Sequence, residues 1–418
     1  MRRYEEHHCW PPDAAMLGPP PGGDGDRDDD NATAHHQPHE NRAVVVAASS
    51  SSPRHLVLAC ADRLHRGDLD GARRAADAVL SLADPRGDAA DRLAHHFARA
   101  LARRVVSNAA AAGPPPPPST SAYLAYNQIA PFLRFAHLTA NQAILEAAAG
   151  RAARRVHIVD LDAAHGVQWP PLLQALAVAG RAEADPPPEV RITGAGTDAD
   201  ALRRTGDRLR AFAASLSLPS FRFHPLLLQP SPFPAQQLAA GIELRPDETL
   251  AVNCVLFLHR LRGEGGAEEF LRWVKSMNPA VVTIAEREEG RAEEEEDDLP
   301  RRAAAAMDYY AAVFDALEAM VPPGSADRLA VEREVLGREI DEAVVGRRWA
   351  TRGFEWWADA ARAAGMAPRP LSTFAVAQAR FLLRLHYPSE GYDVAEEARG
   401  ACVLRWQTRP LMSVSSWH

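Results

Sequence analysis

The stretch from Arg154 to Ala179, RRVHIVDLDAAHGVQWPPLLQALAVA, constrains the fold of this chain more than any other. Residues 156–159 form a β-branched run with one polar residue, which is typical of a strand buried on both faces. An acidic turn follows, and the proline pair after Trp169 then predicts the first turn of a helix. Strand, turn and helix make the first half of a β-α-β unit, where an open α/β sheet usually places its ligand crevice.

The rest of the chain repeats this alternation of strands and helices. Further strands are predicted at 190–194, 221–228, 250–258 and 280–285, with helices at 199–216 and 268–277. Apolar alternation predicts two final strands around 381–385 and 402–406, forming a hairpin across a long linker over 386–399. The predicted fold is α/β: a doubly wound, mostly parallel Rossmann/methyltransferase-like sheet with a C-terminal β-hairpin and an α-helical cap.

Composition divides the chain into a tail and one domain. Residues 1–52 are dominated by Pro, Gly, Asp, Asn, His and Ser and cannot bury enough apolar surface to offset their ordering entropy. A disordered N-terminal tail is therefore predicted there. The domain covers 53–418, and leucine and alanine stripes at helical spacing predict a helical cap over 53–150 before the α/β core of 151–418.

The bulk composition argues against several classes of protein. The net charge of −8 over 418 residues provides no basic field of the kind that a dedicated nucleic-acid binder carries. The four cysteines lie far apart without a CxxC pair, so neither a disulfide framework nor a zinc module is predicted. No window is apolar over the length of a membrane span, and we expect a soluble intracellular protein.

Several residues on or directly after the first, second and fourth predicted strands mark a candidate crevice: Asp160, Asp162, His165, Gly166, Asp198 and Asn253. A methyltransferase needs glycines in the first turn, so that the backbone can approach the methionine and ribose of S-adenosylmethionine. Here only Gly166 remains, and the side chains at 163–165 occupy that space. We therefore predict no catalytic residue, no cofactor and no metal. Asp198 is either a ribose ligand or an ordinary turn residue.

The residues of the first strand allow both a structural and a functional interpretation. Val156, Ile158 and Val159 are expected in the core of a central strand. His157 is either a hydrogen-bonded core histidine or a ligand-binding one. Asp160 either caps the following turn or lines the crevice.

Together these segments resemble the plant GRAS-domain transcriptional regulators, and in particular the Lateral suppressor branch. The VHIID box of that family appears as residues 156–160, with Val159 as its fourth residue. The two leucine-rich regions would correspond to about 53–150 and 205–240. The resemblance runs from about 53 to 418, in order and without a missing block.

Two later regions carry the same resemblance. The region named for Pro, Phe-Tyr and Arg-Glu is represented by Pro279 or Pro300, by Tyr309-Tyr310 and by Arg338-Glu339. The closing Ser-Ala-Trp region appears as Ser415-Ser416-Trp417, with Trp406 at the place of another of its tryptophans.

The resemblance implies a nuclear transcriptional regulator in axillary meristem initiation and shoot branching. It implies action through protein partners, which are other transcription factors or regulators, including homo- or heterodimers. Partner or dimer contacts are expected on the helical cap of 53–150. The sequence gives little support to direct DNA binding, because it has no Lys/Arg stripe. Two other classes stay open: an S-adenosylmethionine-dependent methyltransferase, and a binder of another small ligand in the same crevice.

Overall fold

The computed structural model describes residues 52–106, 117–163, 165–182, 186–216, 218, 220–229, 235–261, 266–289, 298–345, 352–397 and 399–418. The tail predicted over 1–52 lies outside these residues except for Ser52. Among the helices described, none is both long and apolar enough to cross a membrane.

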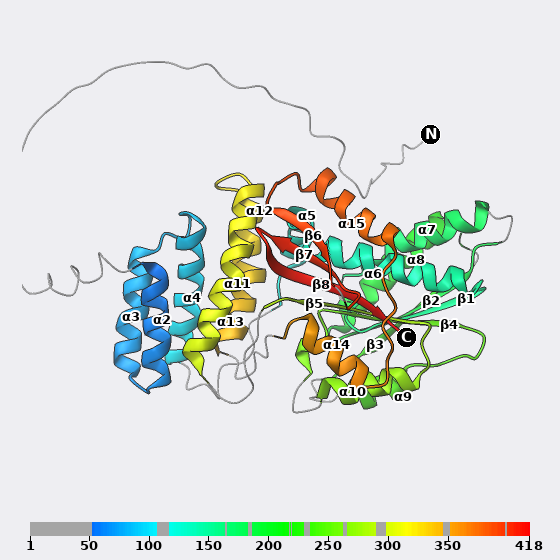
Figure 1. Ribbon diagram of the computed structural model, residues 1–418, viewed down its shortest axis with the longest axis horizontal. Helices are drawn as coiled ribbons and strands as arrows, with labels where there is room; N and C mark the ends of the chain where they lie inside the picture. The colour runs from blue at the N-terminus through cyan, green and yellow to red at the C-terminus, as the bar shows by residue number, and fades with distance from the viewer. Residues whose placement is uncertain are drawn as a thin grey trace, which may run out of the picture. The chain divides into compact units, whose positions relative to one another are not determined.

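One mixed sheet runs through the described residues, with the strand order β3-β2-β1-β4-β5-β8-β7-β6 (Figure 1). The strands are β1 (Arg155–Asp160), β2 (Glu189–Gly196), β3 (Phe221–Leu227), β4 (Thr249–Val255), β5 (Val281–Arg287), β6 (Tyr392–Glu396), β7 (Cys402–Trp406) and β8 (Arg409–Trp417). The first five strands in the spatial order pair in parallel, and β8, β7 and β6 continue the sheet antiparallel. The prediction of an α/β fold with a mostly parallel sheet is confirmed.

Strand β1 is the central strand that its sequence predicts, because it lies between β2 and β4 with residues 156–160 all buried. Its side chains alternate between the two faces of the sheet. Val156 and Ile158 join one apolar cluster with Leu172 of helix α7 (Trp169–Ala182). Val159 joins another with Phe270 of helix α10 (Gly266–Ser276). Burial on both faces explains the continuous apolar pattern.

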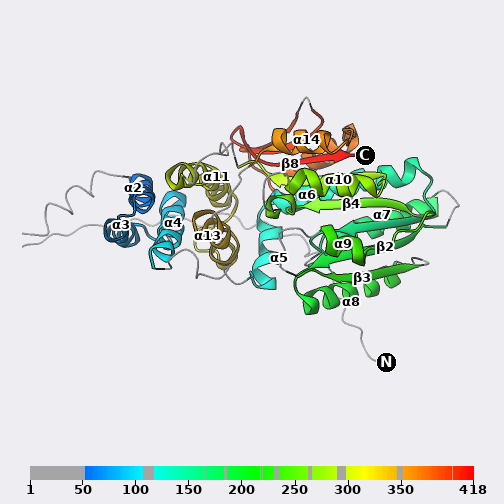
Figure 2. The same cartoon turned by 90° about the horizontal axis from the view of Figure 1, so that it is seen from below.

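Helices cover both faces of the sheet (Figures 1 and 2). One face packs against α6 (Pro131–Gly150), α7 (Trp169–Ala182) and α8 (Ala199–Ser215). The other packs against α9 (Ala235–Gly241), α10 (Gly266–Ser276) and α14 (Phe354–Ala363). A short 3₁₀ helix, η1 (Leu258–Arg260), follows β4.

A separate helical bundle combines segments that are far apart in the sequence. Helices α2 (Pro53–His65), α3 (Leu69–Leu82) and α4 (Ala89–Val106) pack with α11 (Leu299–Met320) and α13 (Gly337–Val345) (Figures 1 and 2). Helix α5 (Thr120–Ile129) contacts α12 (Ala326–Val331) and the π-helix η2 (Glu332–Leu336).

The predicted division of the domain at residue 150 stays a prediction. Contacts cross it in both directions, because α6 packs on the sheet while α11 and α13 complete the bundle.

The strand predicted at 381–385 is wrong, because these residues belong to helix α15 (Thr373–His386). Ser372 caps this helix by accepting a hydrogen bond from the Ala375 amide, and Ala375, Ala379 and Leu383 bury one side at four-residue spacing. The apolar alternation around Leu383 imitated a strand. The predicted linker over 386–399 is also wrong in part, since it contains strand β6.

The last strand of the chain, β8, lies inside the sheet. It pairs with β5 on one side and with β7 on the other, and Trp417 stands opposite Val282 with 1% of its surface exposed. The C-terminal residues therefore join the parallel and antiparallel parts of the sheet.

Truncation after Arg409 should remove the cooperative unfolding of the domain. It removes most of β8, including Trp417, and so leaves β5 without its antiparallel neighbour. Loss of one large buried aromatic side chain alone costs about 3–5 kcal/mol. Thermal unfolding followed by circular dichroism measures the effect. An unchanged melting curve would contradict this reasoning. As a control, Leu82→Ala at a site that is 53% exposed should shift stability by no more than about 0.5 kcal/mol.

Candidate functional site

The candidate crevice is built around Asn253, a fully buried amide on β4. Its nitrogen donates to Asp160 Oδ1 at 3.2 Å and to Gln168 Oε1 at 3.0 Å. Its oxygen accepts from Gln168 Nε2 at 3.0 Å and from Thr283 Oγ1 at 2.9 Å. An amide side chain has two donors and two acceptor lone pairs, so all donors and acceptors of the Asn253 side chain are bonded to other side chains of the protein.

Asp160, at the end of β1, is bound by the same network. Its Oδ2 accepts a hydrogen bond from the indole of Trp169 at 2.8 Å, and the Trp169 side chain is fully buried. Burial raises the pKa of the Asp160 carboxyl to about 6, although the bonds from Trp169 and Asn253 act in the opposite direction. The carboxylate that first suggested a ligand site therefore anchors the first turn of α7.

The acidic turn after β1 is covered by other parts of the chain. Asp162 forms an ion pair with Arg260 Nη2 at 2.6 Å. The imidazole of His165 lies 4.3 Å from the ring of Tyr123 on α5, measured between centroids. Burial, together with the charge of Asp162, raises the pKa of the Tyr123 hydroxyl. Helix α5 thus packs over the turn that a cofactor would have to enter.

The remaining turn residues pack tightly against the sheet and α8. Gly166 has a positive φ of +62°, and a Cβ atom there would lie 2.6 Å from Thr205 Cγ2. A Cβ on Gly194 of β2 would meet the Cβ of Ala163 at 2.7 Å. The expectation that side chains fill the turn also named Ala164, which lies outside the described residues.

Asp198 lies at the N-cap of α8, where its carboxylate accepts a hydrogen bond from the Ala201 amide at 2.9 Å. This arrangement corresponds to the turn-residue interpretation. Of the candidate crevice residues, the structure joins Asp160 and Asn253 by a direct hydrogen bond. The amide of Asp162 also donates to Asp160 Oδ1 at 3.4 Å, whereas the side chains of Asp162 and Asp198 bond to other partners.

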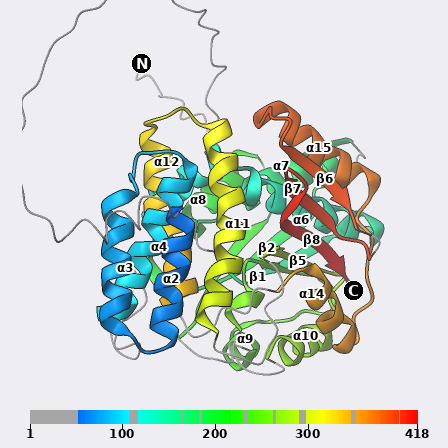
Figure 3. The ribbon, with the colours of Figure 1, turned by 60° about the vertical axis from the view of Figure 1, so that its left-hand side comes forward.

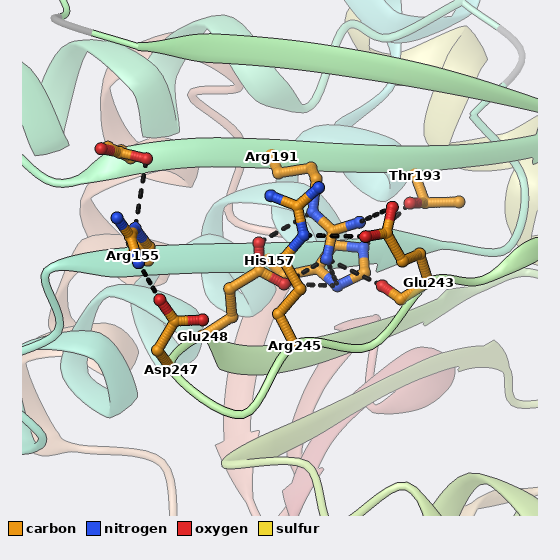
Figure 4. Close-up of polar contacts among 9 residues, drawn as sticks. Arg155, His157, Arg191, Thr193, Glu243, Arg245, Asp247 and Glu248 are labelled. Carbon is orange, nitrogen blue, oxygen red and sulfur yellow. Dashed lines mark hydrogen bonds and ion pairs between the residues drawn. The ribbon is translucent and has the colours of Figure 1, made fainter.

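His157, between Val156 and Ile158 on β1, belongs to a second buried cluster (Figure 4). Arg191 Nη2 donates to His157 Nδ1 at 3.1 Å, so His157 Nε2 carries the proton and donates to Thr193 Oγ1 at 2.9 Å. Burial and the charge of Arg191 lower the pKa of His157 to about 3. Arg191 is neutralised by Glu248, whose carboxylate accepts from its Nε at 2.9 Å. This neutral histidine joins β1 to β2 as a core residue.

Arg338 and Glu339 contact different partners. Arg338 bonds to Glu342 on its own helix at 2.9 Å. Glu339 pairs with Arg287 at the end of β5 and accepts from the Tyr310 hydroxyl at 3.2 Å. The cluster fixes the bundle helices α11 and α13 to the end of the sheet.

The closing residues of the chain are bonded in the same manner. Trp417 Nε1 donates to Ser415 Oγ at 2.9 Å, and Ser416 Oγ donates to the carbonyl of Arg369 at 2.6 Å. Trp406 Nε1 donates to Asp315 of α11 at 2.6 Å. These motif side chains hold β7 and β8 against the surrounding elements.

Sequence reasoning missed several members of the two buried clusters. Gln168 and Trp169 lie within the stretch that it singled out, but no spacing rule pairs them with Asp160 and Asn253. Arg191 was detectable, since a charged residue inside an otherwise apolar strand requires a buried partner. Glu248 precedes β4 in a loop and gave no signal.

Glu248→Gln should destabilise the domain by about 3–5 kcal/mol, because it leaves the buried Arg191 charge with only the exposed Glu243 carboxylate, at 3.9 Å. Chemical denaturation measures the change. The double replacement Arg191→Met with Glu248→Leu should recover most of the loss, since it removes both charges. Arg155→Ala is the matched control on the same sheet, because Arg155 is 46% exposed and its pairs contribute at most about 1 kcal/mol. Equal losses for Glu248→Gln and Arg155→Ala would refute the assignment.

Asp160→Asn should change how stability depends on pH. The folded domain holds the Asp160 proton up to a pKa of about 6, whereas the ordinary value is 3.8. Folding therefore binds a proton between these values, and this stabilising contribution is complete below the lower value and is lost as pH rises to the upper one. The difference is about 3 kcal/mol, so the variant should gain that amount relative to the wild type between about pH 4 and pH 7.

Urea unfolding across that pH range tests this expectation. Asp198→Asn is the control, because an exposed N-cap accepts Asn equally well. A stability difference for Asp160→Asn that does not vary with pH would show that Asp160 is not the titrating group.

The comparisons with known proteins agree with the motifs. The GRAS domain family matches residues 53–418. The chain is 62% identical over 397 residues to Protein MONOCULM 1 of Oryza sativa subsp. japonica, covering 88% of each chain. It is 36% identical over 414 residues to Scarecrow-like protein 18 of Arabidopsis thaliana, covering 87% of this chain and 91% of that relative.

A solved structure gives the same result. The crystal structure of SCL7 in Oryza sativa matches with a TM-score of 0.69 at 33% identity, covering 88% of this chain and 100% of that chain. The resemblance inferred from the motifs, including that to the Lateral suppressor branch, is confirmed. The chain belongs to the GRAS domain family of plant transcriptional regulators.

Proposed function

We propose that this chain is a nuclear transcriptional regulator that acts through protein partners in axillary meristem initiation and shoot branching. The observation that carries the proposal is the 62% identity to Protein MONOCULM 1 over 88% of each chain. The buried clusters support it, because the motif side chains hold helices and strands together. The formal charge of −8 suits contacts with other proteins better than a basic DNA interface.

The sheet itself is proposed to be a Rossmann/methyltransferase-like scaffold that performs no catalysis. The order β3-β2-β1-β4-β5 supports the first part, since doubly wound sheets place parallel strands in that order. Two observations support the absence of catalysis. The Asn253 amide is fully hydrogen-bonded within the protein, and Ala163 packs closely against β2. A binder of another small ligand is the alternative class for the same crevice.

Genetic complementation tests the proposed role. Expression of the full chain in rice plants that lack MONOCULM 1 should restore axillary buds, and a fluorescent fusion should accumulate in the nucleus. The matched control is the chain truncated after Arg409, which should restore no buds because the domain does not fold. Failure of the intact, well-expressed chain to restore buds would refute the role in branching.

A calorimetric titration separates the scaffold from an enzyme. S-adenosylmethionine added to the full chain should give no saturable heat, because Asp160 and Asn253 are bonded to each other and to neighbouring side chains. Saturable binding that disappears in Asp160→Asn, in a variant that still melts cooperatively, would instead establish a cofactor site. A metabolite that raises the melting temperature would favour the small-ligand alternative.

A further inference from the structure

Helix α15 is apolar on two opposite sides. Ala375, Ala379 and Leu383 point inward and pack toward α6 and β6. Phe374 and Phe381 point outward with 58% and 62% of their surface exposed. Leu385 joins them at 59%. Figure 3 shows α15 beside β6, the edge strand of the sheet.

The outward residues form one continuous stripe. Positions 374, 381 and 385 are separated by seven and four residues, which places them on the same side of an α-helix. Phe374 and Phe381 are the aromatic side chains among the large exposed apolar residues of the described chain. A helix that is apolar all round is normally buried on both sides. Here the larger side chains are the exposed ones, and alanines occupy much of the buried side.

A groove runs between this helix and the edge strand. Arg380, Leu383 and Arg384 line it from α15, and Pro388, Tyr392 and Val394 line it from the following turn and β6. Its volume is about 480 Å³. The Tyr392 side chain is 8% exposed, and its hydroxyl is buried without a hydrogen-bond partner. Its ring lies 4.7 Å from that of Trp406, measured between centroids, so Tyr392 forms part of the apolar floor of the groove.

The charges around the stripe indicate the chemistry of the occupant. None of the 14 residues of α15 is acidic, and both arginines of the helix are exposed. Arg380 pairs with Glu396 at 3.1 Å. Across the groove, Asp393 pairs with Arg405, and Glu390 lies on the rim. Arg384 forms no ion pair with the other described residues, so its guanidinium can pair with an incoming carboxylate. A second copy that met this face through its own α15 would bring the arginines of both helices together, which disfavours that occupant.

We propose that the exposed face of α15, formed by Phe374, Arg380, Phe381, Arg384 and Leu385, docks an acidic amphipathic helix of a partner protein. The apolar side of that helix covers the stripe, and one of its carboxylates pairs with Arg384. This inference deepens the proposed function and rests on it, because it names the surface and the kind of partner through which the regulator acts.

A labelled synthetic helix with leucines at positions i, i+3 and i+7 and flanking glutamates is the probe. Fluorescence anisotropy should show saturable binding to the full chain. Phe381→Glu should weaken binding by at least ~30-fold, the loss expected for a central aromatic anchor. Leu69→Glu is the matched control, because Leu69 is 52% exposed on α3 and should leave binding unchanged. The pair Phe381→Ala and Leu385→Ala tests the same face without adding charge.

The alternatives give different results. A peptide with lysines in place of the glutamates should not bind, and equal binding of both peptides would overturn the proposal. Dimerisation of the full chain in sedimentation that Phe381→Glu abolishes would assign the face to a second copy instead. Binding to phosphatidylserine vesicles that depends on Phe381 would assign it to a membrane surface.

The genetic assay separates this inference from the proposed function. Loss of both peptide binding and bud formation in Phe381→Glu, with a melting temperature like that of the wild type, supports both. If Phe381→Glu loses peptide binding but still forms all buds, the regulator does not act through this surface. That result overturns the docking proposal and leaves the regulator role standing. If the wild-type chain binds the peptide but restores no buds, the branching role fails while the docking surface stands.

Discussion

The pairing of β8 with β5 is the contact on which the rest of the structure depends. It attaches the last nine-residue strand to the middle of the sheet and so links the parallel half to β7 and β6. The same strand holds the bundle, because the hydroxyl of Tyr309 on α11 donates to the carbonyl of Leu411 at 3.1 Å. Long-range pairing of this kind is slow to form, but it joins segments that are far apart in the sequence.

Around that frame, buried polar groups connect elements where an enzyme of this architecture would leave an open crevice. Asn253 uses all its donors and acceptors on neighbouring side chains, and Asp160 holds the indole of Trp169. Such a network stabilises only when every member is satisfied, so it specifies one arrangement of β1, β4 and α7. The side chains of Asp160 and Asn253 are thus part of the core, which supports the proposed role of the sheet as a scaffold.

The sequence predicted the central strands well, because burial on both faces leaves a continuous β-branched run such as 156–159. Helix α15 shows where this reasoning fails. Its outward phenylalanines reverse the usual relation between size and burial, so the pattern around Leu383 resembled a strand. Local periodicity assumes that large apolar residues point to the core of their own chain. That assumption breaks down on α15, where Phe374, Phe381 and Leu385 face outward.

The sequence by itself determined the family, the α/β alternation and the chemical character of the motif residues, because these are written in local order and spacing. Only the tertiary structure decided that the bundle combines helices before β1 with helices after β5. It also decided that Asp160 bonds to Trp169 and Asn253, and that Arg191 bonds to His157 and Glu248. These hydrogen-bonded side chains lie up to 93 residues apart. No local pattern encodes such pairs, since they form only when packing brings the strands into register.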